Sequence, residues 1–517
     1  MTTQTGNKRR IWFGLSLFAF AASVLLIGPK LRSQPPQSSS IPQVSHQSTA
    51  MSQDANSSEA AASRSGATYL ALNPGFAIGR LTVMREGMTP GPGDILICSK
   101  VPDDLPRVAG IICTERKPPV EDGNLRAVHD GVPNAFILNA VHDPSVRSYL
   151  DQWVTYRVGQ SDFELGPSDP DAAEQHRRSM RSPTRQTPPR DLSLRDIQRI
   201  SACEYSDRAQ IGVKAANLAA LHRVNLPDGT VPEGYAVPFS FYDEFMRYNG
   251  LYEYARHLIG NAQFQRDRNT RASELKKMRT LIKKGKMPAP MLDALGRTQE
   301  SFAEGTSIRC RSSTNTESLP GFGGAGLYES YTHHPDEGHL SKSIKQVYAS
   351  LWTLRAFDER EFHRADHFVA AMAVILHPSY RSERASGVAV TRDILYRSTK
   401  FHYVFTKLED DVLVPSSRKL RPEELLLPYD INGSVRVIRS SDNRSPYGES
   451  VLSVEHQQQL KRFLSLIHQQ FAELLQVSPQ SPSFAMEIEF KITQSGSLAI
   501  KQARPWGVGK VLTVESN

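Results

Sequence analysis

The sequence predicts an α+β protein with more than one folded domain, and three observations support this prediction. The chain has 517 residues, which is too many for a single hydrophobic core. Residues 67–165 contain short runs rich in Ile and Val between Pro and Gly residues, a pattern typical of buried strands. Residues 193–517 combine helical spacing of apolar residues with separate strand-like segments, and residues 166–192, rich in Pro, Ser and Arg, are expected to link the two domains.

The N-terminus predicts a membrane anchor followed by a disordered tether. An apolar run at residues 11–28 lies between basic residues and is at the short end of what spans a bilayer. No clear cleavage site follows the run, so we expect residues 1–32 to form an uncleaved single-pass anchor, with a removed signal peptide as the alternative. Positive charge flanks both ends, so the positive-inside rule gives only a small preference for a body outside the cytoplasm. Residues 33–66, rich in Ser, Gln and Pro, are predicted to be a tether without a core.

Charge and cysteine usage favour neither a nucleic-acid partner nor a cysteine metal site. The net charge of +8 is partly concentrated in the Pro-rich linker, and no helix-turn-helix, zinc-finger or RNP pattern accompanies it. Four cysteines lack metal-ligand spacing. Cys98 and Cys113 lie in neighbouring strand-like segments and could form a disulfide, but we expect buried free thiols.

The first folded unit reads as a small α/β domain. Its apolar runs at residues 94–98, 108–113 and 134–138 are predicted strands, and residues 124–129 are a candidate helix start.

The segment at residues 307–330 is the strongest candidate for binding a polyphosphate. Arg309 and Arg311 alternate on an extended segment, so both side chains point to the same side. A glycine-rich loop follows, and its backbone N–H groups could approach a bound anion. The alternative is a basic strand followed by a flexible surface turn. The loop glycines are Gly321, Gly323, Gly324 and Gly326.

A second group of candidate residues lies in a hairpin near the C-terminus. Glu487 and Glu489 alternate along one strand, while Gln502 and Arg504 alternate along the returning strand, with the turn near residues 495–496. Two carboxylates on one side are hard oxygen ligands suited to Mg²⁺. The alternative is a solvated hairpin face with cross-strand charge pairs.

Three further segments each give a structural prediction. Lys214 follows Gly212 at a predicted helix start, where it could hold phosphate or be a surface residue. Apolar residues at three- and four-residue steps over residues 340–354 predict one amphipathic helix, with Arg355 as a cation at its C-terminal end. Residues 372–376 predict a continuous apolar strand.

Five segments of the chain, here called blocks, resemble in order the ATP-binding domain of phosphoenolpyruvate synthases, pyruvate phosphate dikinases and glucan water dikinases. The blocks are GVKAANL with VPEGYAVP, IRCRSSTNTESLPGFGGAGLYES, SIKQVYASLWTLRAFDERE, MAVILHPSYRSERASGVAVTRD and MEIEFKITQSGSLAIKQARPW. The resemblance implies an ATP-grasp-like fold over residues 193–517 that binds Mg²⁺ and ATP. It implies that ATP is bound by Lys214, Arg309, Arg311, Gly323, Gly324, Gly326, Arg355, Gln502 and Arg504, that Mg²⁺ is held by Glu487, Glu489 and Gln502, and that Arg311 and Arg355 act in catalysis.

The first domain resembles the phosphohistidine swivelling domain of the same family, through GFAIGRLTV, GDILICSKVPDDLPRVAGIICTE and NLRAVHDGVPNAFI. Nine residues before the glycine of the closing motif, where the family carries its histidine, this chain has Asp122. A carboxylate could form an acyl phosphate but lacks the proton exchange of an imidazole. We expect His129, seven residues further on, to be a surface histidine.

Two functions remain open from the sequence. The first is a membrane-anchored ATP-dependent phosphotransferase with an unidentified phosphoryl acceptor, pyruvate not being expected without a barrel domain. The second is a non-catalytic nucleotide-binding or scaffold protein descended from that family, because Asp122 replaces the histidine.

Overall fold

The computed structural model describes residues 68–102, 105–324, 326–379, 383–408, 421–430, 432–441 and 450–507, all within one compact unit, Ala61–Asn517. The predicted anchor at residues 1–32 and the tether at residues 33–66 lie outside these residues. Over the described ranges, no helix combines the length and apolar character that a bilayer crossing requires.

The small domain, residues 68–167, is a seven-stranded sheet in the order β1-β5-β4-β3-β2-β6-β7. Its central strands β2 to β5 are parallel neighbours, with antiparallel strands at both edges. The predicted strands and helix are confirmed, and the helix α2 joins β4 to β5. The elements are β1 (Tyr69–Asn73), β2 (Gly75–Val83), β3 (Asp94–Cys98), β4 (Gly110–Cys113), α2 (Asp122–His129), β5 (Asn134–Ile137), β6 (Trp153–Val158) and β7 (Phe163–Pro167).

Apolar side chains cover both faces of this sheet and form two separate clusters. Parallel strands that are buried on both faces have continuous runs of Ile and Val. The positions of these strands could therefore be predicted from the sequence. Cys98 and Cys113 are register partners on β3 and β4, and both are buried free thiols, as expected.

The segment after the small domain contains a helix, α4 (Pro170–Ser179), within the stretch predicted to be a linker. Asp169 accepts a hydrogen bond from the Ala172 N–H, and Pro170 occupies the first turn, so the helix has a well-formed start. Its buried Ala173 faces the small domain, where α4 contacts β2.

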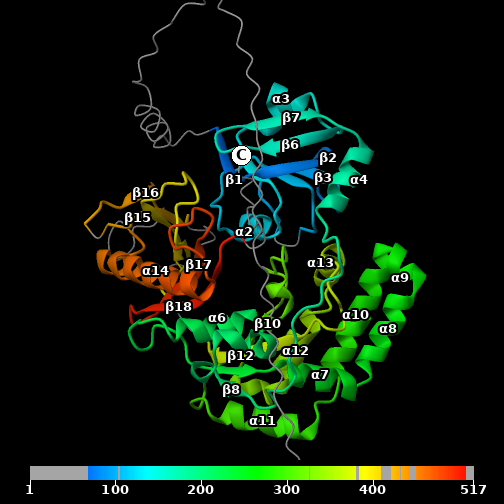
Figure 1. Ribbon diagram of the computed structural model, residues 1–517, viewed down its shortest axis with the longest axis vertical. Helices are drawn as coiled ribbons and strands as arrows, with labels where there is room; N and C mark the ends of the chain where they lie inside the picture. The colour runs from blue at the N-terminus through cyan, green and yellow to red at the C-terminus, as the bar shows by residue number, and fades with distance from the viewer. Residues whose placement is uncertain are drawn as a thin grey trace, which may run out of the picture. The chain divides into compact units, whose positions relative to one another are not determined.

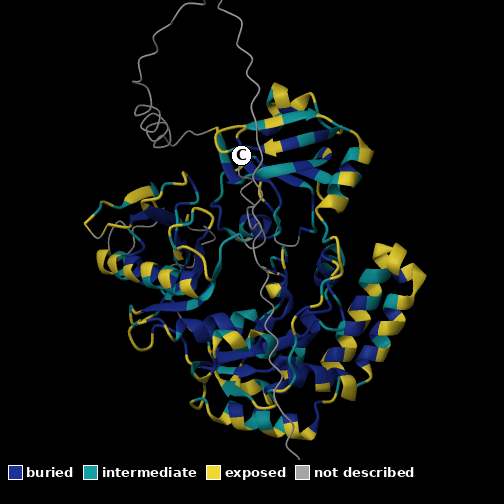
Figure 2. Ribbon diagram, viewed as in Figure 1, coloured by how far each residue is buried: buried dark blue, intermediate teal, exposed yellow. Residues whose placement is uncertain are grey.

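The large domain, residues 193–507, contains two sheets that meet along its middle (Figure 1). The first sheet has the order β11-β10-β12-β9-β8 and the second β16-β15-β14-β13-β17-β18. Figure 2 shows that the strands of both sheets are largely buried, whereas the outer helices expose one face. Their strands are β8 (Gln198–Arg199), β9 (Tyr235–Val237), β10 (Ile308–Thr314), β11 (Tyr331–His333), β12 (Met372–Pro378), β13 (Ala385–Val390), β14 (Phe401–Leu408), β15 (Glu423–Pro428), β16 (Arg436–Arg439), β17 (Met486–Ile492) and β18 (Leu498–Pro505).

Helices cover each sheet of the large domain. A helical cluster packs against the first sheet, and α14 (Val454–Leu474) and α6 (Val213–Leu221) pack against the second. The cluster on the first sheet includes α7 (Phe239–Tyr248), α8 (Leu251–Gly260), α10 (Arg268–Lys284), α11 (Ala289–Glu300), α12 (Ser341–Ser350) and α13 (Leu354–Phe362).

The single helix predicted over residues 340–354 is wrong, because the chain forms two helices there. α12 ends at Ser350, and the Thr353 side chain accepts a hydrogen bond from the Ala356 N–H and begins α13. Arg355 therefore lies in the first turn of a new helix and not at a helix C-terminus. A threonine cap competes with helix continuation, and apolar spacing alone does not reveal it.

Candidate functional site

The centre of the site is Arg311 on β10, which contacts the second sheet. Its guanidinium donates hydrogen bonds to the Gln502 side chain and to the Lys501 carbonyl, the latter at 2.8 Å. It also lies 3.5 Å from the Glu489 carboxylate. Arg311 thereby joins the two sheets through groups that the sequence placed in separate blocks.

Arg309 lies on the same strand but reaches a different neighbour. Its guanidinium donates to the Thr332 hydroxyl at 3.0 Å, at the β11 side of the sheet. Burial and the neighbouring Arg311 lower its pKa, because two cations share a partly buried surface.

The predicted hairpin is confirmed as β17 and β18, with Glu487 opposite Arg504 and Glu489 opposite Gln502. Glu487 is buried and accepts two hydrogen bonds from Arg504, at 3.0 and 2.6 Å. Burial by itself raises the pKa of Glu487, but Arg504 and His129 outweigh it and lower that pKa to about 2. Glu487 is therefore a carboxylate at neutral pH.

Lys214 is held at the start of α6 by contacts between α6 and β10. Gly212 precedes the helix with φ +81°, and a Cβ there would lie 2.5 Å from the Ser313 hydroxyl. That hydroxyl donates to the Ile211 carbonyl and accepts from the Ala215 N–H, so the helix start is fixed on β10. The Lys214 ammonium lies 2.5 Å from the Glu317 carboxylate.

The glycine loop after β10 lies against the small domain. A Cβ on Gly323 would stand 2.4 Å from the His129 carbonyl oxygen, so only glycine fits this contact. Gly324 and Gly326 have positive φ angles, and Arg355 donates to the Gly326 carbonyl at 3.1 Å. Gly326 and Arg355 are thus neighbours in space.

His129 is buried in this site, so the expected surface position was wrong. It ends α2, and its Nε2 lies 2.8 Å from the free oxygen of the Glu487 carboxylate. Burial and the Arg504 cation lower its pKa, so it is neutral and donates its Nε2–H to Glu487. Its Nδ1 is buried without a hydrogen-bond partner among the described residues.

Asp122 and His129 stand at opposite ends of α2. Seven residues in a helix return to nearly the same face, about 10 Å further along the axis. The spacing of Asp122 and His129 in the sequence was therefore a signal that His129 shares the face of the predicted acceptor. The structure describes the backbone of Asp122 as the first residue of α2, and its side chain lies outside what is described.

Two lysines of the hairpin were missed by the sequence analysis. Burial and the neighbouring Lys501 lower the pKa of Lys491 to about 7, and burial and the neighbouring Arg311 lower the pKa of Lys501 to about 8. Lys491 also forms an ion pair with Glu383. Lys491 follows Glu489 by two residues, so the same alternation that identified the carboxylates could have identified this cation.

Four cations of the site are each close to a carboxylate of the chain. Lys214 is paired with Glu317, Arg311 with Glu489, Arg355 with Asp130 at 3.7 Å, and Arg504 with Glu487. The oxygens of a bound polyphosphate would replace these carboxylates as partners of the four cations. One of the four pairs, Arg355 with Asp130, is made with the small domain, and His129 of that domain also contacts the second oxygen of Glu487.

The small domain is held over the site by further contacts. Arg107 makes an ion pair with Glu359 of α13 at 3.0 Å, and Arg116 lies 3.5 Å from the buried Glu424 of β15. Val120 belongs to an apolar cluster with residues of the second sheet. The docked arrangement is thus supported at three places.

The predicted metal ligands form a set of oxygen donors rather than a closed metal centre. Within the described residues, no group of three or more His, Cys, Asp or Glu side chains has the geometry of a metal centre. Glu487 and Gln502 are buried side chains, while Glu489 is partly exposed on the same hairpin. Hard oxygen donors of this kind fit Mg²⁺, which usually keeps several waters and uses phosphate oxygens as further ligands.

Comparison with known proteins assigns most of the large domain. Residues 208–515 match the family described as "Pyruvate phosphate dikinase, AMP/ATP-binding domain". Phosphoenolpyruvate synthase of Aeropyrum pernix is 30% identical over 190 residues, covering 35% of this chain and 22% of that protein. The Aquifex aeolicus protein of the same name is 32% identical over 191 residues, with 35% and 22% covered.

A rifampicin phosphotransferase of Bacillus cereus is also similar, at 23% identity over 308 residues, covering 57% of this chain and 34% of that protein. The chain therefore spans about a fifth to a third of the length of these curated relatives. A solved structure, D-alanyl-alanine synthetase A from Vibrio cholerae, matches 41% of this chain and 46% of its own chain at 10% identity and a TM-score of 0.18.

Proposed function

Because the chain belongs to the pyruvate phosphate dikinase AMP/ATP-binding domain family, we propose that it is an ATP-dependent phosphotransferase. The large domain would bind Mg-ATP between its two sheets, and the small domain would control access to the phosphates. Membrane anchoring through residues 1–32, with the body outside the cytoplasm, is part of the proposal and rests on the sequence alone.

The observation that carries the proposal is the convergence of predicted residues from separate segments on one surface. Arg311 of β10 contacts Gln502 and Glu489 of the hairpin, and α6 fixes Lys214 beside β10. These segments are separated by roughly a hundred residues or more in the sequence, which makes a chance cluster of charge-bearing side chains a poor explanation.

The chain's own residues would bind the triphosphate and offset its charge. The triphosphate would replace the carboxylates that now pair with four of the cations. The cations that would bind it are Lys214, Arg309, Arg311, Arg355 and Arg504. Glu487, Glu489 and Gln502 would hold Mg²⁺, which would supply positive charge that offsets the charge of the phosphates. Phosphoryl transfer needs mainly such positioning and charge stabilisation from a protein.

In the docked arrangement, His129 donates a hydrogen bond to Glu487, one of the residues that would hold the metal, and Asp130 pairs with Arg355. Full engagement of Mg-ATP therefore requires the small domain to withdraw α2 from the site. The two relatives' names, phosphoenolpyruvate synthase and rifampicin phosphotransferase, point to different acceptors, so the family leaves the acceptor of this chain open.

The test uses the full chain, calorimetry with Mg-ATP, and the variants Arg311→Met and Lys214→Met. Loss of either contact should weaken binding about 10- to 150-fold, in keeping with about 1.5–3 kcal/mol for a hydrogen bond to a charged group. Arg256→Ala, which removes an exposed arginine on α8, is the matched control and should leave binding unchanged. A wild-type chain that does not bind Mg-ATP would contradict the proposal.

A second experiment separates the enzyme from a non-catalytic nucleotide-binding protein. The chain is incubated with Mg²⁺ and ATP labelled at the β- or γ-phosphate, and label on protein and release of AMP are measured. Asp122 and His129 lie about 10 Å apart on α2, so the two variants Asp122→Ala and His129→Asn test two separate positions. The residue that accepts the phosphoryl group is the one whose replacement abolishes label on the protein. Binding without turnover or label would favour the non-catalytic alternative.

A further inference from the structure

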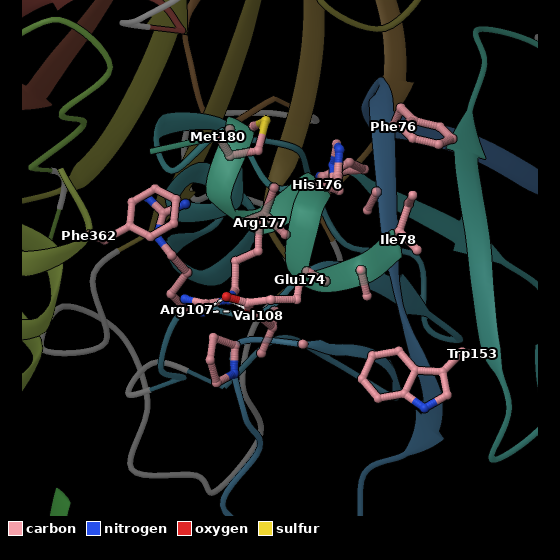
Figure 3. Close-up of a pocket in the computed structure, with 18 of the residues that line it drawn as sticks. Phe76, Ile78, Arg107, Val108, Trp153, Glu174, His176, Arg177, Met180 and Phe362 are labelled. Carbon is pink, nitrogen blue, oxygen red and sulfur yellow. Dashed lines mark hydrogen bonds and ion pairs between the residues drawn. The ribbon is translucent and has the colours of Figure 1, made fainter. Parts of the chain in front are cut away.

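A cavity of about 390 Å³ lies between the small domain, α4 and α13, away from the site described above. Figure 3 shows Phe76, Ile78 and Trp153 of the small domain on one side of it, and Met180 and Phe362 on the other. We call this space the joint cavity. An engineered cavity of about 150 Å³ holds a benzene molecule, so the joint cavity has room for two or three rings.

The charged groups that line the joint cavity are already paired. Glu174 accepts hydrogen bonds from Arg177 at 2.8 Å, and the Arg107 guanidinium binds Glu359 and the Asp130 carbonyl. A charged ligand would therefore have to break an existing pair to gain one of its own. The cavity suits an uncharged ligand with a large apolar surface.

One polar group in the lining suits a neutral hydrogen-bonding ligand. His176 of α4 packs edge-on against Phe76, with ring centroids 5.3 Å apart. Its pKa is lowered by burial, so the ring is a neutral imidazole at pH 7. A hydroxyl on the ligand would be a suitable partner for such a ring.

One wall of the joint cavity comes from the large domain. Phe362 belongs to α13 of the large domain, and the Arg107 guanidinium of the small domain lies 3.9 Å from the centre of its ring. Gly131, which also lines the cavity, directly follows His129 and Asp130, the residues that occupy Glu487 and Arg355. A ligand that fills the cavity would bind the docked arrangement and lose one wall when the domains separate.

We propose that the joint cavity binds an uncharged small molecule of two or three aromatic rings, and that this ligand weakens Mg-ATP binding. Since the ligand favours the docked arrangement and Mg-ATP favours withdrawal of α2, each opposes the other by the same factor. The coupling rests on the proposed function, whereas ligand binding to the cavity does not.

The first test measures binding of radiolabelled 2-naphthol to the full chain by equilibrium dialysis. We expect saturable binding of one molecule per chain. Ala173→Trp, which places an indole from α4 into the cavity, should weaken binding at least about tenfold, and Ala172→Trp, one residue away and outside the lining, should not. Non-specific uptake of naphthol is the same for both variants in one buffer. The difference in naphthol binding between Ala173→Trp and Ala172→Trp therefore measures binding in the cavity.

A second variant guards against misfolding of Ala173→Trp. Met180 lies at the rim and is 44% exposed, so Met180→Glu should fold normally and weaken naphthol binding by placing a charge beside the apolar wall. Equal naphthol binding by the wild type and both cavity variants would overturn the cavity as a ligand site.

The coupling is tested by titrating Mg-ATP with and without saturating 2-naphthol. We expect the dissociation constant for Mg-ATP to rise about fivefold, at the lower end of typical coupling between sites. An unchanged constant with retained naphthol binding would overturn the coupling alone. A chain that binds naphthol but never binds Mg-ATP would instead contradict the proposed function and leave the cavity site supported.

Discussion

Replacement of His129 by alanine is the sharpest test of the closed site. In the docked arrangement the His129 Nε2–H donates to the Glu487 carboxylate at 2.8 Å, and both side chains are buried. A hydrogen bond to a charged group contributes about 1.5–3 kcal/mol, which corresponds to about 10- to 150-fold in the docking equilibrium. Arg504 still pairs with Glu487 in the variant, so the Glu487 carboxylate stays ionised.

We therefore expect His129→Ala to bind Mg-ATP more tightly than the wild type, by about tenfold at the lower end of that range, because the competitor for Glu487 is gone. Calorimetry on the full chain without added acceptor measures this change. His142→Ala, which removes an exposed histidine of the small domain, is the control and should behave as wild type. Weaker Mg-ATP binding by His129→Ala would refute the reasoning, since it would make His129 a direct contributor to nucleotide binding.

Three further predictions concern the loop, the lysines and the buried carboxylate. Gly323→Ala should loosen the contact with α2, because its Cβ would meet a carbonyl oxygen at 2.4 Å; faster amide exchange in α2 would show this, with Gly260→Ala, which meets nothing within 4 Å, as control. Burial and Lys501 lower the pKa of Lys491 to about 7, so its cation is present below pH 7 and lost above it. Mg-ATP should accordingly bind more tightly at pH 6 than at pH 8, and Lys491→Met should reduce this dependence; an unchanged dependence would exclude Lys491 from the phosphate surface. Arg504→Met should lower the free energy of unfolding by about 3 kcal/mol at pH 7, since the pKa of Glu487 is held at about 2 against an ordinary 4.5. That stabilisation is present above pH 4.5 and is lost as the pH falls toward 2, so urea unfolding at pH 3 should show a smaller difference between the variant and the wild type.

Local patterns in the sequence were enough to predict much of the fold. The buried strands β3, β4 and β5, the strand β12 and the hairpin of β17 and β18 all follow from apolar runs or two-residue alternation. The same alternation predicted which side of the hairpin carries Glu487 and Glu489. These features depend on neighbours within about ten residues, so the sequence contains the information directly.

Other features depend on interactions that the spacing of apolar residues in the sequence does not indicate. A cap at Thr353 divides one amphipathic pattern into α12 and α13, and a cap at Asp169 starts α4 within a Pro-rich stretch. Lys491 and Lys501 acquire their lowered pKa values only because the folded chain buries them, Lys491 beside Lys501 and Lys501 beside Arg311. No periodicity reports such burial.

The sequence by itself determined which residues this protein has available for a nucleotide: two arginines on a strand, a glycine loop, a lysine at a helix start and a carboxylate pair on a hairpin. Only the tertiary structure decided how they are paired, and it paired them with the chain's own carboxylates and with His129. The physical reason is that desolvated charges need partners, and which partner is within reach depends on the packing of the two domains.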